Sequence, residues 1–87
     1  MYFVYVLQSI KDGKYYIGQT NNLTARLIRH NTGQVKATKS RIPFRLVYKE
    51  RYDLRSSAIK RKIEIKRMKG GNQFKELLNE YWGVAKW

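Results

Sequence analysis

Two short runs of β-branched and aromatic residues, separated by a turn signal, open the chain and limit the folds available to it. The runs cover residues 2–8 and 14–19, and the Asp12-Gly13 dipeptide lies between them. Asp-Gly favours the tight turns that join antiparallel strands, because glycine adopts a positive φ at no steric cost. The sequence therefore predicts an N-terminal β-hairpin.

A helix and a third strand are predicted after the hairpin. Asn21 and Asn22 are both good N-cap residues, and Gly33 is a typical residue just beyond a helix end, so we expect a helix of two to three turns between them. After Pro43, apolar residues alternate with Arg45 and Lys49 in the manner of a half-buried strand. The apolar members are Phe44, Leu46 and Tyr48.

Two further helices complete the predicted order ββαβαα. Asp53 can cap a long helix that reaches about residue 69, Gly70-Gly71 ends it, and Asn72 can cap the last helix. This order predicts an α/β fold in which helices flank a small, mostly antiparallel three-stranded sheet. Eighty-seven residues fill only one core, so we expect a single domain over residues 1–82 and a short tail over residues 83–87.

The charge balance indicates the class of partner. Nineteen Lys and Arg against six Asp and Glu give a formal charge of +13, which costs self-repulsion unless the chain meets a polyanion or an acidic surface. Nucleic acid is the leading partner, and anionic lipid, an acidic protein and a merely solvated basic surface are the alternatives. No run approaches the roughly 20 apolar residues of a membrane span, and no membrane partner is predicted.

The residue inventory removes most enzyme classes. The chain has no cysteine and one histidine, which excludes disulfides, thiolate metal sites and zinc clusters, and it leaves the cytoplasm as the expected compartment. What remains are two strand tyrosines, Tyr5 and Tyr16, together with Arg26 and His30, which share one helix face at i and i+4. Taken singly, such tyrosines are usually packing residues and such a histidine is usually a surface residue.

The joint spacing of these four residues resembles the GIY-YIG nuclease superfamily, and most closely its small stand-alone bacterial members. The likeness starts with Val4-Tyr5-Val6 and Tyr16-Ile17-Gly18, continues with Arg26 and His30, and covers roughly residues 2–80. Its later part is carried by Thr38, Arg41, Pro43, Leu46-Val47-Tyr48, Ala58 and Ile65-Lys66.

The resemblance implies a DNA-directed endonuclease that acts in repair, recombination or mobile-element biology with one Mg²⁺ or Mn²⁺ ion. It implies that Tyr5 and Tyr16 lie in the active site, where a tyrosine activates the attacking water. By the same likeness His30 assists the proton transfer and Arg26 neutralises phosphate charge. Gln19 stands where some relatives carry a lysine.

One position departs from the family pattern. The pattern places the metal-binding glutamate four residues after Ala58, where this chain has Lys62. A helical wheel puts Lys62 on the apolar arc of Leu54, Ala58, Ile59, Ile63, Ile65 and Met68, and so predicts that it points inward to the core or toward the pocket. Glu64 falls on the opposite arc as a weak substitute ligand, which only a register shift or a bulge would bring back.

Three interpretations of Lys62 stay open: a natural non-cleaving homologue, a deliberately altered chain, and a nuclease that holds its metal differently. The alternative function is a non-catalytic nucleic-acid binding module, and the oligomeric state is left open. Tyr48, Tyr52 and Phe44 are expected to pack in the core in preference to stacking on bases. The residues expected to contact nucleic acid are Lys36, Lys39, Arg41, Arg45, Lys60, Arg61, Lys66, Arg67 and Lys69, with Lys49 and Arg51 beside them.

Overall fold

The elements follow the predicted order ββαβαα. A computed structural model describes the backbone of residues 1–85 and the side chains of residues 1–79. The elements are β1 (Tyr2–Ser9), β2 (Tyr15–Thr20), α1 (Leu23–Asn31), the 3-10 turn η1 (Lys39–Arg41), β3 (Phe44–Tyr52), α2 (Arg55–Met68) and α3 (Asn72–Ala85). The predicted boundary between residues 82 and 83 falls within α3, and residues 86–87 of the predicted tail lie outside the described part.

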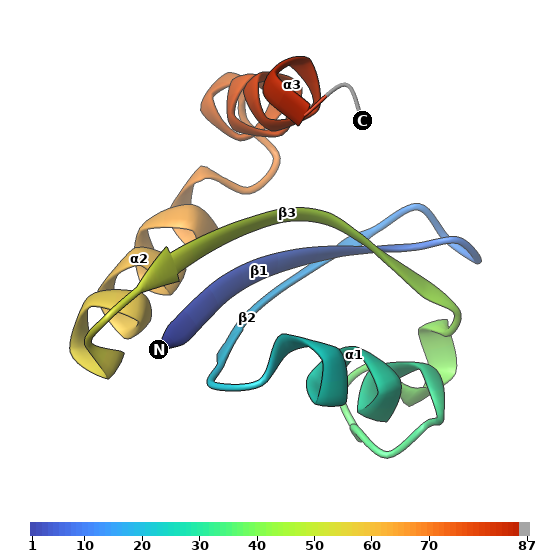
Figure 1. The fold of residues 1–87 in the computed structure, drawn as a ribbon. Helices are drawn as coiled ribbons and strands as arrows, with labels where there is room; N and C mark the ends of the chain where they lie inside the picture. The colour runs from blue at the N-terminus through green and yellow to red at the C-terminus, as the bar shows by residue number, and fades with distance from the viewer. Residues whose placement is uncertain (86–87) are drawn as a thin grey trace.

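The sheet has the order β2-β1-β3, and β1 pairs antiparallel with both neighbours. This confirms the predicted three-stranded antiparallel sheet. Figure 1 shows α1 on one face of the sheet and α2 with α3 on the other. The hairpin register pairs Tyr5 with Gly18 and Gln8 with Tyr15, and a β-bulge between Val6 and Leu7 interrupts the pairing of β1 with β3.

Each face of the sheet buries its own apolar cluster, because successive strand side chains point to opposite faces. On the α2 and α3 face, Val4 and Val6 pack with Ala58, Ile65 and Phe74. On the α1 face, the smaller cluster consists of Tyr5, Leu7 and Phe44, with Tyr16, Leu23, Leu27, Ile42 and Leu46 packed against it. The expected core role of Phe44 and Tyr48 is confirmed, since both are buried.

Helix ends follow the predicted residues at most positions. The side chain of Asn22 accepts a hydrogen bond from the Ala25 amide at 3.0 Å and caps α1. Gly33 and Gly70 have φ of +76° and +88°, as expected of residues that end helices. The prediction that Asp53 caps α2 was wrong, because the N-cap is Leu54, whose side chain makes no capping bond. Asn72 is the first residue of α3.

The buried stripe of α2 is narrower than the helical wheel predicts. Ala58 and Ile65 are fully buried, whereas Leu54 is 64% exposed and Ile63 is 44% exposed. The wheel assigned Leu54 and Ile63 to the core, and this was wrong: Leu54 precedes the first helical turn, and Ile63 lies beyond the stripe that touches the sheet. None of the helices within the described residues has the length and hydropathy needed to cross a membrane.

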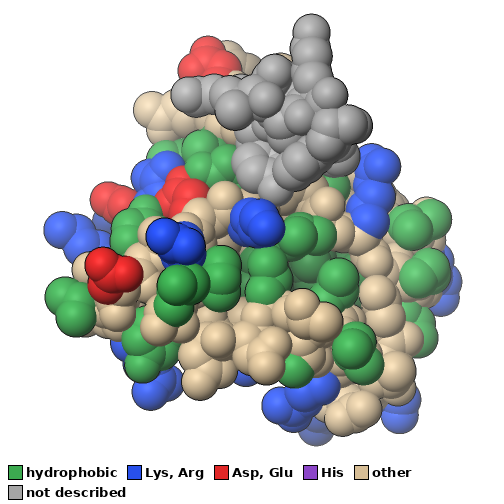
Figure 2. All heavy atoms as spheres, viewed as in Figure 1, with side chains coloured by type: hydrophobic (Ala, Val, Ile, Leu, Met, Phe, Trp, Pro, Cys, Tyr) green, Lys and Arg blue, Asp and Glu red, His purple; other side chains and the backbone are tan. Residues whose placement is uncertain are grey.

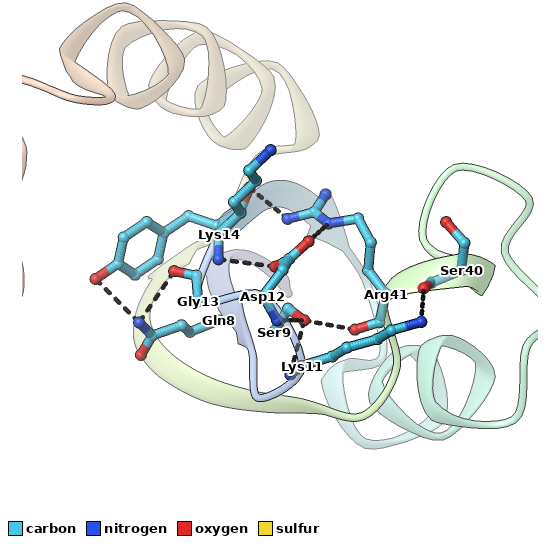
Figure 3. A network of polar contacts seen from close by, with 9 residues as sticks. Gln8, Ser9, Lys11, Asp12, Gly13, Lys14, Ser40 and Arg41 are labelled. Atoms are coloured by element: carbon cyan, nitrogen blue, oxygen red, sulfur yellow. Dashed lines mark hydrogen bonds and ion pairs between the residues drawn. The ribbon is translucent and has the colours of Figure 1, made fainter.

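A polar network ties the hairpin loop to η1 (Figure 3). The Ser9 hydroxyl donates to the Arg41 carbonyl at 2.6 Å and accepts from the amides of Lys11 and Asp12 at 3.1 Å each. The Arg41 side chain returns to the Asp12 carboxylate, with Nε and Oδ2 3.2 Å apart. These bonds satisfy the backbone of the loop and fix the chain segment that leads into β3.

Candidate active site

A chain of hydrogen bonds links β1, α1 and the segment before η1. The Tyr5 hydroxyl lies 3.0 Å from Nε2 of His30, and Nδ1 of the same ring lies 2.8 Å from Oγ1 of Thr38. All three side chains are buried. The sequence singled out Tyr5 and His30, and the structure brings them into direct contact although they lie 25 positions apart.

Thr38 favours one tautomer of His30. Its hydroxyl lies 3.4 Å from the Val35 carbonyl, to which it donates. The oxygen lone pairs then face Nδ1 of His30, so the proton of the neutral ring sits on Nδ1 and Nε2 is left as an acceptor. Tyr5 therefore donates its proton to Nε2 in the resting state.

The environment holds this pair neutral. Burial lowers the pKa of His30 to about 4, and the positive charges of Arg26 and Arg29 act in the same direction. Burial also raises the pKa of Tyr5 above its usual value, as does Tyr16, while Arg26 opposes the rise. At neutral pH the site thus holds a phenol hydrogen-bonded to an unprotonated imidazole.

Tyr16 completes an aromatic enclosure around His30. The centroid of its ring lies 4.9 Å from that of His30 and 6.4 Å from that of Tyr5. Phe44 closes another side, with its centroid 6.0 Å from that of the imidazole. We call Tyr5, Tyr16 and His30 the tyrosine–histidine cluster. Its aromatic walls exclude water from the ring nitrogens and leave Tyr16 as the partly exposed member.

Gly18 makes room for the Tyr5 ring. The two residues are cross-strand partners, and a Cβ atom added at Gly18 would lie 2.6 Å from Cζ of Tyr5. Real Cβ contacts are essentially never so short, so any side chain here displaces the ring. The glycine of the Tyr16-Ile17-Gly18 triplet therefore has a steric role that the sequence alone did not reveal.

Arg26 projects into a polar pocket next to the cluster. The pocket measures about 220 Å³ and lies where β2 leads into α1, close to the start of α2. We call it the arginine pocket; its lining residues are Tyr2, Gln19, Thr20, Asn21, Arg26 and Arg55. Within residues 1–79, neither Arg26 nor Arg55 forms an ion pair. Two guanidinium groups without acidic partners suit an anion. Arg55 was not among the residues predicted from sequence.

The donor set of this pocket does not fit a divalent cation. Mg²⁺ and Mn²⁺ prefer carboxylate oxygens, yet none of the described residues that line the arginine pocket is acidic. Nor does any group of three or more His, Asp or Glu side chains come together elsewhere in the described part of the chain. Two arginines would moreover repel the ion. Gln19 contributes a buried Oε1 that has no partner among the described residues.

Lys62 and Glu64 lie on α2, the helix that covers the sheet face opposite the tyrosine–histidine cluster. Lys62 is partly buried and is not among the lining residues of the arginine pocket. Glu64 is on the surface, where its Oε1 lies 3.6 Å from Arg61 in an i, i+3 pair and its side chain is 47% exposed. Glu64 therefore forms a surface ion pair with Arg61.

The most strongly engaged carboxylate is Glu50 on β3, which the sequence did not single out. Arg61 donates to both of its oxygens, with Nε 2.9 Å from Oε1 and Nη2 3.0 Å from Oε2, and the hydroxyls of Tyr48 and Tyr52 donate as well. Burial opposes ionisation of Glu50, but these bonds outweigh it and lower its pKa. They raise the pKa of Arg61 in turn, with the bond to Glu50 as the largest cause. We call this set the Glu50 clamp.

The residues expected to contact nucleic acid fall into three groups. Lys49 and Arg51 are cross-strand partners of Tyr5 and Phe3, so they project from the cluster's face of the sheet, and both are exposed. Arg41 and Arg61 are partly buried and already paired with Asp12 and Glu50. The remaining predicted contacts are exposed, namely Lys36, Lys39, Arg45, Lys60, Lys66, Arg67 and Lys69.

Comparisons with known proteins agree with this geometry. A family model described as the GIY-YIG catalytic domain matches residues 1–76. A UPF0213 protein of Staphylococcus saprophyticus is 44% identical over 66 residues, which cover 75% of this chain and 79% of that protein. A UPF0213 protein of Staphylococcus epidermidis is 46% identical over the same shares. The solution NMR structure of a UPF0213 protein from Bacillus halodurans is similar with a TM-score of 0.53 and 33% identity, and covers 92% of this chain and 84% of that one.

Proposed function

The chain belongs to the GIY-YIG family, and from that premise we propose that it is a DNA-directed phosphodiesterase domain whose metal binding is impaired. The observation that carries the proposal is the buried contact between Tyr5 and His30, 3.0 Å long, beside a pocket that holds Arg26. Hydrogen bonds from Tyr5 through His30 to Thr38 compensate the burial of these polar groups and fix their positions. The whole domain of residues 1–82 is the proposed functional unit.

The proposed chemistry is activation of a water molecule by Tyr5. As the water loses a proton to the Tyr5 oxygen, the phenolic proton passes to Nε2 of His30. The new hydroxide attacks phosphorus, and the bond from phosphorus to the leaving oxygen breaks, with that oxygen taking a proton from solvent. Arg26 supports the step because its charge stabilises the new hydroxide and the negative charge that grows on the phosphate. Tyr16 is proposed to position the water as the exposed wall of the cluster.

The proposed role of Arg26 is to bind the scissile phosphate. Its guanidinium has no acidic partner among residues 1–79, and a planar fork of donors fits two phosphate oxygens at once. Negative charge grows on those oxygens during displacement, so a fixed cation stabilises the transition state more than the ground state. Lys49 and Arg51, on the same face of the sheet, are proposed to hold neighbouring phosphates.

Lys62 is proposed to be the reason for impaired metal binding. It stands at the family's metal-ligand position, and neither it nor the described lining of the arginine pocket offers a carboxylate. Replacing a carboxylate by an ammonium group at this position removes a ligand for Mg²⁺ or Mn²⁺ and adds a charge that repels the ion. Binding of DNA would then persist while hydrolysis is slow.

Nicking of supercoiled plasmid DNA in Mg²⁺ or Mn²⁺ tests the proposal. The unchanged chain should retain the plasmid but nick it slowly, and Lys62→Glu should raise the nicking rate at least tenfold. Lys66→Glu makes the same charge change at an exposed position of α2 and should not raise the rate. Rapid Mg²⁺-dependent nicking by the unchanged chain would refute the role given to Lys62.

A non-catalytic nucleic-acid binding module is the second candidate function. The absence of acidic residues from the described lining of the arginine pocket favours it, because such a pocket holds a phosphate without cleaving it. Under this alternative Lys62→Glu weakens DNA binding and produces no nicking. Failure of the unchanged chain to retain DNA at about 50 mM salt, where phosphate contacts are strongest, would exclude both functions.

A further inference from the structure

A second basic cleft lies at the other end of β2 from the arginine pocket. It measures about 390 Å³, within the range of cavities that hold small ligands. The hairpin loop forms one side, and the connection from α2 to α3 with the first turns of α3 forms the other. Apolar walls come from Tyr15, Phe74 and Leu78. We call it the lysine cleft.

The rim of the lysine cleft is cationic. Lys14, Lys69 and Lys75 all line it and are exposed, and no ion pair engages any of them within residues 1–79. Figure 3 shows the Lys14 side chain extending away from the polar network of the hairpin loop. None of the described lining residues is acidic. An apolar wall with a rim of lysines matches a ligand that has an apolar flat face and a phosphate at its edge, which is the chemistry of a nucleotide.

The spacing of the two sites matches a DNA strand. Tyr15 lines the lysine cleft and Thr20 lines the arginine pocket, and both belong to β2. Five residues of strand at about 3.3 Å each separate the two sites by about 17 Å. Each strand of duplex DNA rises about 3.4 Å per nucleotide, so this distance corresponds to about five nucleotides of a strand in duplex form. Because β2 is an edge strand, a strand of DNA can run along it from one site to the other.

We propose that the lysine cleft binds an unpaired nucleotide about five positions from the phosphate held by Arg26. The base contacts the wall of Tyr15 and Leu78, and the lysines bind the flanking phosphates. A base within duplex DNA is stacked and paired and cannot enter the cleft, so the preferred substrate is a duplex that continues into a single strand. The distance of about five nucleotides rests on the proposed function, which places a phosphate at Arg26. The inference adds the class of substrate to that function.

Three labelled DNAs of equal length test the inference by fluorescence anisotropy: a duplex, a single strand, and a duplex with a single-stranded extension of eight nucleotides. The double variant Lys69→Gln/Lys75→Gln should weaken binding of the extended duplex about tenfold more than binding of the plain duplex. Lys60→Gln/Lys66→Gln removes the same charge from exposed positions of α2 and should weaken binding of all three DNAs by one common factor.

A 2-aminopurine base placed at successive positions of the extension provides a readout that does not depend on the variants. We expect its fluorescence to change sharply at one or two adjacent positions, where the base leaves its neighbours and enters the cleft. Equal responses at every position, or equal factors for the two lysine pairs, would overturn the inference while leaving the proposed function in place. Failure to bind any of the DNAs would overturn both.

Discussion

Gly18 determines where the Tyr5 hydroxyl lies, because the Tyr5 ring crosses the strand at the only position of β2 without a side chain. Gly18→Ala should therefore displace the ring, break its bond to His30 and cost about 1–3 kcal/mol of unfolding free energy, as overpacking does. Urea denaturation measures the loss. In a Tyr5→Leu background the ring is gone, so the same change should cost much less, and equal costs in both backgrounds would contradict the steric role of Gly18.

His30 should make the fold sensitive to acid. Its pKa of about 4 in the folded chain lies below the ordinary value of 6.5, so the unfolded chain takes up the proton first as pH falls. The contribution of the neutral imidazole to stability is complete above pH 6.5 and is lost toward pH 4. The free energy of unfolding should decrease by about 2 kcal/mol between pH 7 and pH 5. His30→Gln cannot titrate and should show a flatter dependence in urea denaturation. Equal slopes for the two chains would exclude a buried neutral imidazole.

Residue types and spacing singled out Tyr5, Tyr16, Arg26 and His30 as candidates, but they did not indicate the residues that position them. Thr38 orients the imidazole through a contact between residues eight apart in a segment without regular structure, and no periodicity predicts such a contact. Arg55 reaches the arginine pocket only because the start of α2 lies near the start of α1. The steric demand of Tyr5 on Gly18 likewise depends on the strand register.

At the scale of elements, the Glu50 clamp attaches α2 to β3. The side chains of Arg61 and Glu50 are only 25% and 18% exposed, so removing the cation leaves a largely buried carboxylate with two hydroxyl donors. Arg61→Met should destabilise the fold at pH 7 by about 1–3 kcal/mol, since an unpaired buried charge costs more than a lost pair. Glu50→Gln added to Arg61→Met should recover part of this loss.

The pH dependence of the clamp has a definite sign. Glu50 has a lowered pKa in the folded chain, so its contribution is present above the ordinary value of 4.5 and is lost as pH falls below it. Thermal denaturation at pH 7 and below pH 4 should show the difference between Arg61→Met and the unchanged chain shrinking in acid. Glu64→Gln, which alters the exposed partner of Arg61, is the control and should have little effect at either pH. A constant difference would contradict the assignment.

Element order could be predicted from the sequence because each element carries a local signal: Asp12-Gly13 for the hairpin, Asn22 for the start of α1 and Gly70 for the end of α2. The cap of α2 could not, since Asp53 is an excellent cap type placed one residue before the actual N-cap. Which residues of α2 are buried depends on how closely the helix approaches the sheet. A helical wheel carries no information about that approach. For this reason Ile63 was assigned to the core and is exposed.

For the whole molecule, basic side chains are spread over the surface. Figure 2 shows Lys and Arg side chains at the edges of one face and near its middle, with hydrophobic side chains and a few acidic ones among them. The formal charge of +13 is therefore available to a polyanion. Part of this charge is concentrated at two sites, one at each end of β2. One site holds Arg26 and Arg55, and the other holds three lysines. Under the proposed function, these two sites receive an extended anionic strand.

The most direct test of the tyrosine–histidine cluster as a reaction centre is the single-turnover nicking rate of Lys62→Glu with and without Tyr5→Phe. Tyr5→Phe keeps the ring over Gly18 and removes only the oxygen that contacts His30. We predict a loss of about 10²-fold or more, the scale of general acid–base catalysis, with unchanged DNA affinity. Tyr52→Phe removes a hydroxyl of the Glu50 clamp, on the opposite face of the sheet, and should change the rate less than about threefold. Nicking that survives Tyr5→Phe, or no nicking by Lys62→Glu, would contradict the account.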